Sequence, residues 1–167
     1  IGFVPQKVVL VSGTIASIIK CAGEEIDERT MMEAARVAQA ETFILEKAQQ
    51  YESEISQGGT NVSGGQKQRL SIARAIAKNP PIYLFDDSFS ALDYKTDVTL
   101  RRALKEKTAM ATVVIVAQRI STVLHADKII VLEEGKIVGM GNHETLLQTC
   151  EQYMEIAKSQ LSEAELK

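Results

Sequence analysis

The hydrophobic pattern of the second half of the chain predicts strands and helices in alternation. Residues 82–85 and 113–117 are continuous apolar runs, which is the pattern of strands in a buried parallel sheet. A stretch with helical spacing, about 95–107, separates the two runs. Fully apolar strands on either side of a helix indicate a right-handed parallel crossover, and hence an α/β fold.

Two further elements are predicted after this crossover. Strand-like segments at 128–132 and 136–140 lie on either side of Glu133-Glu134-Gly135, which predicts a hairpin turn. The last segment, 144–167, has a helical pattern. Its apolar side consists of Leu146, Leu147, Cys150, Tyr153, Met154, Ala157 and Leu161. For this segment we favour a helix packed on the core over a dimer interface, because an apolar stripe usually faces a core.

The first 80 residues are mainly helical in pattern, apart from a short buried strand and a loop predicted over 1–12. Asp27 is a candidate N-cap for a helix with apolar residues at helical spacing, and a second short helix is predicted over 42–50. After a polar, glycine-rich loop, Ser63 begins another helix, which Asn79-Pro80-Pro81 ends.

Composition and charge are those of a soluble globular protein. Of the 167 residues, 45% are hydrophobic and 25% are charged, and this length suffices for one domain. The net charge of −3 and the sequence pI of about 5.5 give no basic stripe, so we expect no nucleic-acid partner. No apolar run approaches the roughly 18 residues that span a bilayer.

Four residues of the types that bind metals are isolated in the sequence. Cys21, Cys150, His125 and His143 lie in none of the spacings typical of metal ligands, so they predict no metal site. The amino-terminal residues Ile1-Gly2-Phe3 carry neither a start methionine nor a basic targeting region. We therefore expect the chain to be a fragment of a longer protein.

The strongest local signal is Ser63-Gly64-Gly65-Gln66, at the predicted start of a helix. Backbone amides at a helix start carry partial positive charge, glycines let a phosphate approach, and the serine hydroxyl can add a hydrogen bond. A serine and two glycines alone would favour an ordinary capped helix. The longer segment 61–69, however, resembles the signature motif of ATP-binding cassette (ABC) proteins, commonly LSGGQ, with Val62 in place of leucine.

The apolar run 82–85 ends in two acids, Asp86 and Asp87. At the carboxyl end of a parallel strand, a carboxylate can bind the magnesium ion of a nucleotide. The segment is similar to the Walker B motif of P-loop NTPases. This resemblance implies that Asp86 binds the magnesium ion. Ser90-Ala91-Leu92-Asp93 resembles the D-loop of the ABC family, which crosses the dimer interface, so Asp93 is assigned to the nucleotide-binding residues.

Val4-Pro5-Gln6 resembles the Q-loop of the family, whose glutamine contacts magnesium and senses the membrane domain. The resemblance implies that Gln6 belongs to both the metal-binding and the nucleotide-binding residues. Segment 11–15 is similar to exporters that fuse a membrane domain to the ATPase, and segment 53–59 is similar to them in part. The resemblance covers the chain from Gln6 to about Leu147.

The resemblance implies a partial P-loop NTPase core with a parallel sheet, plus a helical signature lobe. The core would comprise 1–13 and 79–143, the helical lobe about 14–78, and a C-terminal helix 144–167. ATP and Mg²⁺ are the implied cofactors, and ATP hydrolysis in the full-length dimer is the implied activity. The chain contains no G-x-x-x-x-G-K-[ST] segment, so the phosphate-binding Walker A loop is missing and we expect the isolated chain to be inactive.

Two catalytic positions depart from the pattern of active ABC sites. Asp87 replaces the glutamate that positions the attacking water, and it is one methylene, roughly 1.5 Å, shorter. Gln118 replaces a histidine, and glutamine cannot carry a positive charge near neutral pH. The chain therefore resembles the degenerate subunit of a heterodimeric exporter. Its intact Ser63-Gly64-Gly65-Gln66 would complete the ATP site of the partner.

The implied partners are a second ABC ATPase subunit, in a heterodimer, and a transmembrane domain of the same parent chain. These partners would place the chain at the cytoplasmic face of the cell membrane, coupling ATP binding and hydrolysis to substrate export. Two alternatives remain. One is the C-terminal lobe of a chromosome-maintenance or DNA-repair ATPase head, which predicts long heptad arms before Ser63. The other is a non-enzymatic regulator that keeps only the dimerising surface.

Overall fold

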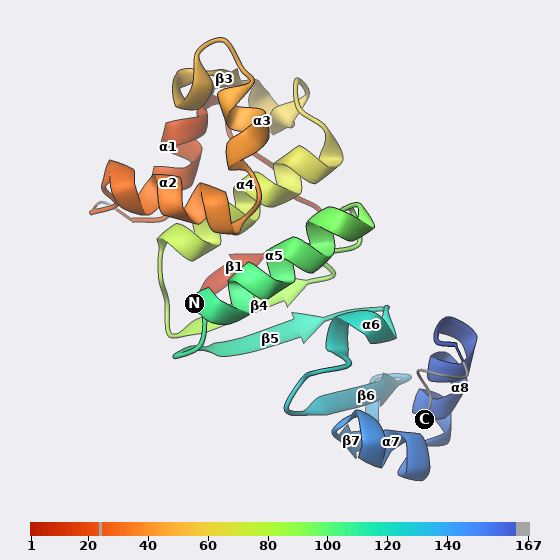
Figure 1. Ribbon diagram of the computed structural model, residues 1–167. Coiled ribbons are helices and arrows are strands. Elements are labelled where there is room, and N and C mark those ends of the chain that lie inside the picture. The colour runs from red at the N-terminus through yellow and green to blue at the C-terminus, as the bar shows by residue number, and fades with distance from the viewer. Residues whose placement is uncertain (24, 163–167) are drawn as a thin grey trace. The chain divides into compact units, whose positions relative to one another are not determined.

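A computed structural model describes residues 1–23 and 25–162 of the chain. The chain forms two compact units, Ile1–Val116 and Ala117–Lys167, and each has its own hydrophobic core (Figure 1). Within the described residues, no helix is both long enough and apolar enough to cross a membrane.

A three-stranded parallel sheet forms the base of the first unit, in the order β1-β4-β5. Its elements are β1 (Gly2–Val4), β4 (Ile82–Asp86) and β5 (Thr112–Val116), with α5 (Tyr94–Lys107) between β4 and β5. The register pairs Val4 with Phe85, and Asp86 with Val116. The predicted parallel strand–helix–strand unit is therefore confirmed.

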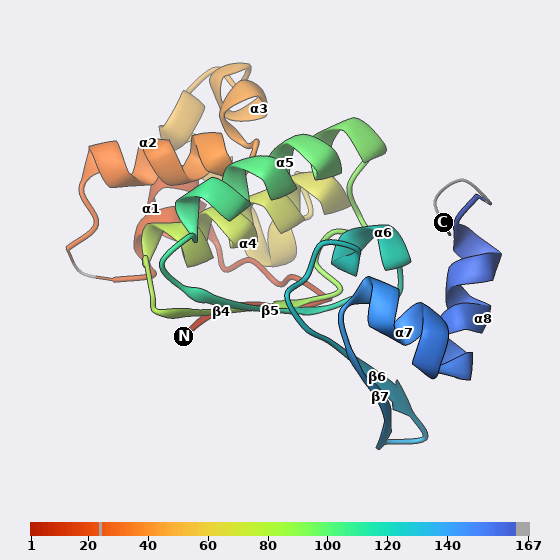
Figure 2. The same ribbon diagram turned by 60° about the horizontal axis from the view of Figure 1, so that its bottom comes forward.

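The apolar strands predict a sheet buried on both faces, and this prediction is wrong for the described residues. The helices of the first unit lie on one side of the sheet, where they bury Tyr83 and Phe85 (Figure 2). On the other side, Phe3, Val114 and Val116 are 50%, 45% and 51% exposed. The strands carry apolar side chains on both faces, whereas the helices of the first unit cover only one face.

Helices dominate the chain between β1 and β4. They are α1 (Ile15–Lys20), α2 (Glu28–Val37), α3 (Glu41–Leu45) and α4 (Gly64–Ala77), accompanied by the antiparallel pair β2 (Gly13–Thr14) and β3 (Glu54–Ile55) and by the 3-10 turns η1 (Gln50–Glu52) and η2 (Gln57–Gly59). α4 packs against α1, α2 and β1, and its Leu70, Ile72 and Ile76 are fully buried. α4 therefore ties the other helices to the sheet (Figure 1).

Two helix predictions in this region have different outcomes. Asp27 is the N-cap of α2, as predicted: its Oδ1 accepts a hydrogen bond from the Thr30 amide at 2.7 Å. This hydrogen bond holds the pKa of the Asp27 carboxyl below its ordinary value. The helix predicted over 42–50 is too long, because α3 ends at Leu45. Gln50 has a φ of +47°, in the left-handed region, which cannot continue a right-handed helix.

The second unit contains the predicted hairpin. Its elements are α6 (Ile120–Val123), β6 (Ile129–Glu133), β7 (Lys136–Gly141), α7 (His143–Thr149) and α8 (Glu151–Gln160). β6 and β7 pair antiparallel, and the turn between them has φ of +48° at Glu134 and +76° at Gly135. Positive φ at both turn residues matches the right-handed twist of a tight hairpin.

The single helix predicted over 144–167 is instead two helices, α7 and α8. Cys150 separates them with an extended backbone, φ −129° and ψ 106°, so α8 begins in a new direction. This bend lets both helices contribute to one core, Leu146 from α7 and Tyr153 and Ala157 from α8. Residues 163–167 of that prediction lie outside the described residues.

Gly139, on β7, leaves no room for a side chain. A Cβ there would lie 2.7 Å from Cys150 Sγ and 3.0 Å from Leu146 Cδ2. We expect Gly139→Ala to lower the free energy of unfolding of the second unit by about 1–3 kcal/mol, because an added methyl overpacks a filled core. Urea unfolding of the purified chain measures this loss.

The matched control is Gly135→Asn in the same hairpin. Nothing lies within 4 Å of a Cβ at Gly135, and asparagine tolerates positive φ, so this variant should keep the urea midpoint of the unchanged chain. An unchanged midpoint for Gly139→Ala would contradict the packing of Cys150 against β7.

Candidate functional site

The parallel register brings together two segments that lie far apart in the sequence. Val4 is opposite Phe85, so the residues that follow β1 and β4 lie at the same edge of the sheet. There, Gln6 Nε2 donates a hydrogen bond to Asp87 Oδ2 at 3.2 Å, across 81 residues of sequence. The segments that resemble the Q-loop and Walker B are therefore in direct contact.

Several hydrogen bonds fix the turn after β4. Asp87 has a φ of +43°, a conformation that aspartate adopts more readily than most residues. Its amide donates to Val116 O at 2.9 Å, and its carbonyl accepts from Ser90 Oγ at 2.9 Å. The buried Ser88 Oγ donates to Val4 O at 2.9 Å. The half-buried carboxyl of Asp87 thus projects from a backbone that is held on both sides.

Asp86 and Gln6 both carry side-chain oxygen atoms at this edge of the sheet. Asp86 is the last residue of β4 and is half-buried, and Gln6 retains Oε1 as an acceptor while its Nε2 donates. Residues 1–23 and 25–162 contain no group of three or more His, Cys, Asp or Glu side chains that could hold a metal ion. The oxygen donors fit Mg²⁺, which typically binds one or two protein ligands together with phosphate and water oxygens.

The predicted helix start at Ser63 is confirmed, with a reciprocal capping box. Ser63 Oγ accepts from the Gln66 amide at 3.2 Å, and Gln66 Oε1 accepts from the Ser63 amide at 3.0 Å. Gly64 has open space within 4 Å of a Cβ built on it, whereas a Cβ on Gly65 would lie 3.3 Å from Ala91 O. The first glycine therefore leaves room for a ligand, and the second lets the segment resembling the D-loop approach α4.

Two residues of α4, Gln68 and Arg69, belong to segment 61–69, but the resemblance of that segment indicates no individual role for either of them. Gln68 is 3% exposed and donates through Nε2 to Pro5 O at 3.4 Å, which links α4 to the residue before Gln6. Arg69 donates to Gln39 O at 2.7 Å and lies over the Phe43 ring at 4.8 Å. Burial lowers the pKa of the Arg69 guanidinium. Gln68 precedes buried Ile72 by one helical turn, so its position on the apolar face was the available signal.

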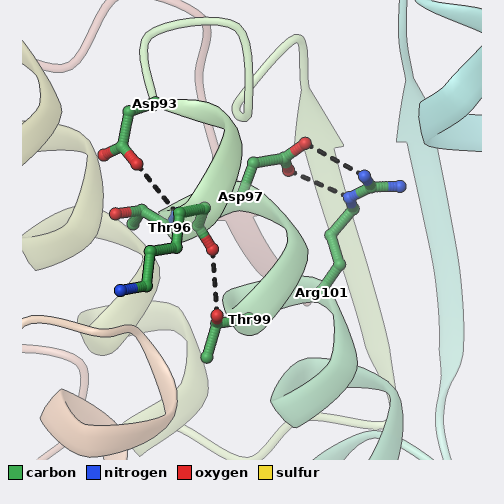
Figure 3. Close-up of polar contacts among 6 residues, drawn as sticks. Asp93, Thr96, Asp97, Thr99 and Arg101 are labelled. Carbon is green, nitrogen blue, oxygen red and sulfur yellow. Dashed lines mark hydrogen bonds and ion pairs between the residues drawn. The ribbon is translucent and has the colours of Figure 1, made fainter.

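Asp93 is the N-cap of α5, and this local role is seen in Figure 3. Its Oδ1 accepts from the Thr96 amide at 3.0 Å, and the hydrogen bonds from Thr96 hold the pKa of the Asp93 carboxyl below its ordinary value. One turn further along α5, the buried Asp97 binds the Arg101 guanidinium through two hydrogen bonds of 2.9 and 3.0 Å (Figure 3). These contacts fix the start of α5 directly after the segment resembling the D-loop.

Gln118 belongs to the second unit, in the loop before α6. Its carbonyl accepts a hydrogen bond from Gln160 Nε2 at 2.9 Å, and the Ile120 amide donates to Gln160 Oε1 at 2.8 Å. Gln160 has no signal in the sequence, because nothing in the pattern of α8 indicates a contact with a residue 42 positions away.

A family model described as ABC transporter matches residues 1–90. An uncharacterized ABC transporter ATP-binding protein of Mycobacterium bovis is 48% identical over 163 residues, covering 96% of this chain and 28% of that protein. An ATP-dependent lipid A-core flippase of Saccharophagus degradans is 40% identical over 162 residues, covering 97% of this chain and 28% of that protein.

A solved structure of a bacterial Atm1-family ABC exporter with ATP bound superimposes with a TM-score of 0.91 at 35% identity. The match covers 98% of this chain and 28% of the exporter chain. This similarity confirms the predicted α/β fold class. The chain spans 28% of the length of each of these relatives.

Proposed function

The chain belongs to the ABC transporter family, and we propose on this basis that it is part of the nucleotide-binding domain of an exporter. In the proposed function, it couples ATP binding and hydrolysis to the export of a substrate across a membrane. The observation that carries the proposal is the hydrogen bond between Gln6 and Asp87, at the edge of the sheet where Asp86 also lies. Ligands gather at this edge in open parallel sheets.

Each predicted site residue has a proposed task. Asp86 and Gln6 would bind Mg²⁺, which would neutralise the phosphate charges of bound ATP. Ser63, Gly64, Gly65 and Gln66 would present the start of α4 to the γ-phosphate of a nucleotide. In support, Gly64 has open space around it, and α4 has 14 residues over which backbone dipoles can align. Asp93 would lie at the dimer interface.

We further propose that the two ATP sites of the dimer are unequal. Asp87 and Gln118 would weaken the site to which this chain contributes its sheet edge. The intact capping box and glycines at the start of α4 would complete the site of the partner. The partner would be a second ABC ATPase subunit in a heterodimer, and a transmembrane domain of the same parent chain would carry the substrate. The chain would then lie at the cytoplasmic face of the cell membrane.

The two alternative functions have less support. A chromosome-maintenance or DNA-repair head predicts long heptad arms, but α1, α2 and α3, which precede Ser63, have only 6, 10 and 5 residues. The similarity to an exporter structure over 98% of the chain also favours transport. Steady-state ATP hydrolysis by the full-length protein with its partner separates an ATPase from a non-enzymatic regulator, which would show no activity.

The isolated chain is expected to bind Mg-ATP very weakly and to hydrolyse none. The sequence has no G-x-x-x-x-G-K-[ST] segment, so the backbone amides and the lysine that hold the phosphates are missing from these 167 residues. Titration calorimetry should give a dissociation constant above about 1 mM, with the full-length protein as the positive control. Micromolar affinity in the isolated chain would mean that the nucleotide site lies elsewhere.

A further inference from the structure

The carboxamide of Gln160 joins the end of α8 to the loop that carries Gln118. Gln160 is the last residue of α8, and its two hydrogen bonds, to Gln118 O and from the Ile120 amide, have lengths of 2.9 and 2.8 Å. Both lengths lie in the range of good hydrogen bonds. Because the two backbone groups flank Arg119, one planar side chain fixes the main chain on both sides of that residue.

The chemistry of this contact suits the carboxamide of glutamine. A backbone carbonyl only accepts and a backbone amide only donates, so the contacting side chain must offer one donor and one acceptor. A carboxamide does so while remaining neutral. Glutamate at position 160 would place a second acceptor against Gln118 O, and methionine would offer neither a donor nor a strong acceptor.

The loop depends on this contact because α6 is only four residues long. A helix of one turn has no intrinsic stability, and the first amides of any helix need partners from outside it. Arg119, the N-cap of α6, makes no side-chain capping bond, so Gln160 satisfies the Ile120 amide instead. Ile120 also packs in the core that Tyr153 and Ala157 of α8 share, and α6 lies against α8.

We propose that Gln160 is a positioning residue for Gln118. This inference rests on the proposed function, and it assigns the Gln118 carboxamide to a hydrogen bond with the γ-phosphate at the site of this subunit. Gln160 sets the backbone from which the Gln118 side chain extends, so the C-terminal end of α8 determines how well that site distinguishes ATP from ADP. Gln160 does not itself touch the nucleotide.

The test measures nucleotide preference in the full-length protein assembled with its partner. Photolabelling with 8-azido-ATP, resolved by subunit on a gel and competed with either ATP or ADP, gives the preference for ATP at this subunit. We expect Gln160→Met and Gln160→Glu to reduce the preference roughly 2- to 10-fold, the value of one or two lost hydrogen bonds. The affinity for ADP should stay constant, because ADP lacks the γ-phosphate.

A matched control is available on the same helix. Gln152 also uses its carboxamide, but it donates to the Glu133 carboxylate at 3.2 Å and contacts the hairpin instead of the loop. Gln152→Met removes an equivalent amide from α8 and should leave the ATP preference unchanged. A general loosening of the second unit would instead weaken ATP and ADP binding together, in the control and the test variants alike, and would overturn the positioning role.

A double-mutant cycle completes the test. If Gln160 acts through Gln118, Gln160→Met should have no further effect on the ATP preference of a Gln118→Ala protein. Additive effects would overturn the inference. If Gln118→Ala changes the preference while neither Gln160 variant does, this inference alone fails. If Gln118→Ala has no effect, the proposed role of Gln118 fails, and the positioning role fails with it.

Discussion

Gly64→Asp in the full-length protein is expected to lower steady-state ATP hydrolysis by about 100-fold or more. In the proposed dimer, Gly64 meets the γ-phosphate at the site of the partner, and an added carboxylate would repel it. Like charges in a partly desolvated site cost several kcal/mol, and each 1.36 kcal/mol is a factor of ten in rate.

The structure predicts that this variant folds normally. Nothing lies within 4 Å of a Cβ on Gly64, and an acidic residue in the first turn of a helix interacts favourably with the helix dipole. Loss of activity would therefore report on the phosphate contact instead of on stability. Gly64→Asn is the matched control, because it adds nearly the same volume without the charge and should lose less activity.

Asp87→Asn is the comparison that tests the division of labour between the two sites. We expect it to change the same rate by less than about 3-fold, because in the proposed function Asp87 is one methylene too short to position the attacking water, and a misplacement of about 1 Å can cost on the order of 100-fold. Asparagine also keeps an oxygen that can accept the hydrogen bond from Gln6 Nε2. A larger loss for Asp87→Asn than for Gly64→Asp would reverse the proposed assignment of the sites.

The sequence predicts those features of the fold that depend on local chemistry. The apolar runs at β4 and β5 and the helical spacing of α5 define the parallel unit without any knowledge of contacts. The helix caps at Asp27 and Ser63 were also predictable, because a short polar residue just before an apolar helical pattern commonly caps the helix. The order of the motifs then indicated the family.

The features that the sequence does not predict depend on contacts between distant residues. Gln6 and Asp87 are 81 residues apart, and only the pairing of β1 with β4 brings them together. The bend at Cys150 has no local signal, since glycine and proline are absent there and the apolar stripe continues across it. Gln160 is an ordinary exposed residue in the pattern of α8, and its partners become visible only when the chain folds.

The predicted site residues fall between these two cases. The resemblance to the family identifies these residues, but only the structure shows which atoms surround them. Gly64 and Gly65 are the same residue type, yet only Gly65 lies close to another segment of the chain, where a Cβ would approach Ala91 O. Asp86 and Asp87 are both acidic, yet Asp86 ends the strand while Asp87 occupies a left-handed turn and contacts Gln6. Such differences decide which substitution should alter folding and which should alter chemistry.

Restoring the usual residues at both altered positions is expected to recover hydrolysis at the site of this subunit. Asp87→Glu extends the carboxylate by one methylene, roughly 1.5 Å. The backbone should hold its place during this change, because the Asp87 amide and carbonyl are bonded to Val116 O and Ser90 Oγ. Gln118→His adds a group that can carry a positive charge toward the γ-phosphate.

Neither substitution alone should suffice, because catalytic residues that act as a unit contribute non-additively. We expect the double variant to hydrolyse ATP about 10-fold or more faster than either single variant, since a misplacement of 1 Å can cost on the order of 100-fold. The measurement is phosphate release by the full-length protein, after the catalytic glutamate of the partner has been changed to glutamine to silence its site. Full recovery with Asp87→Glu alone would mean that reach is the whole defect. No recovery in the double variant, with ATP still bound at this subunit, would show that the altered residues are not the cause of the proposed inequality.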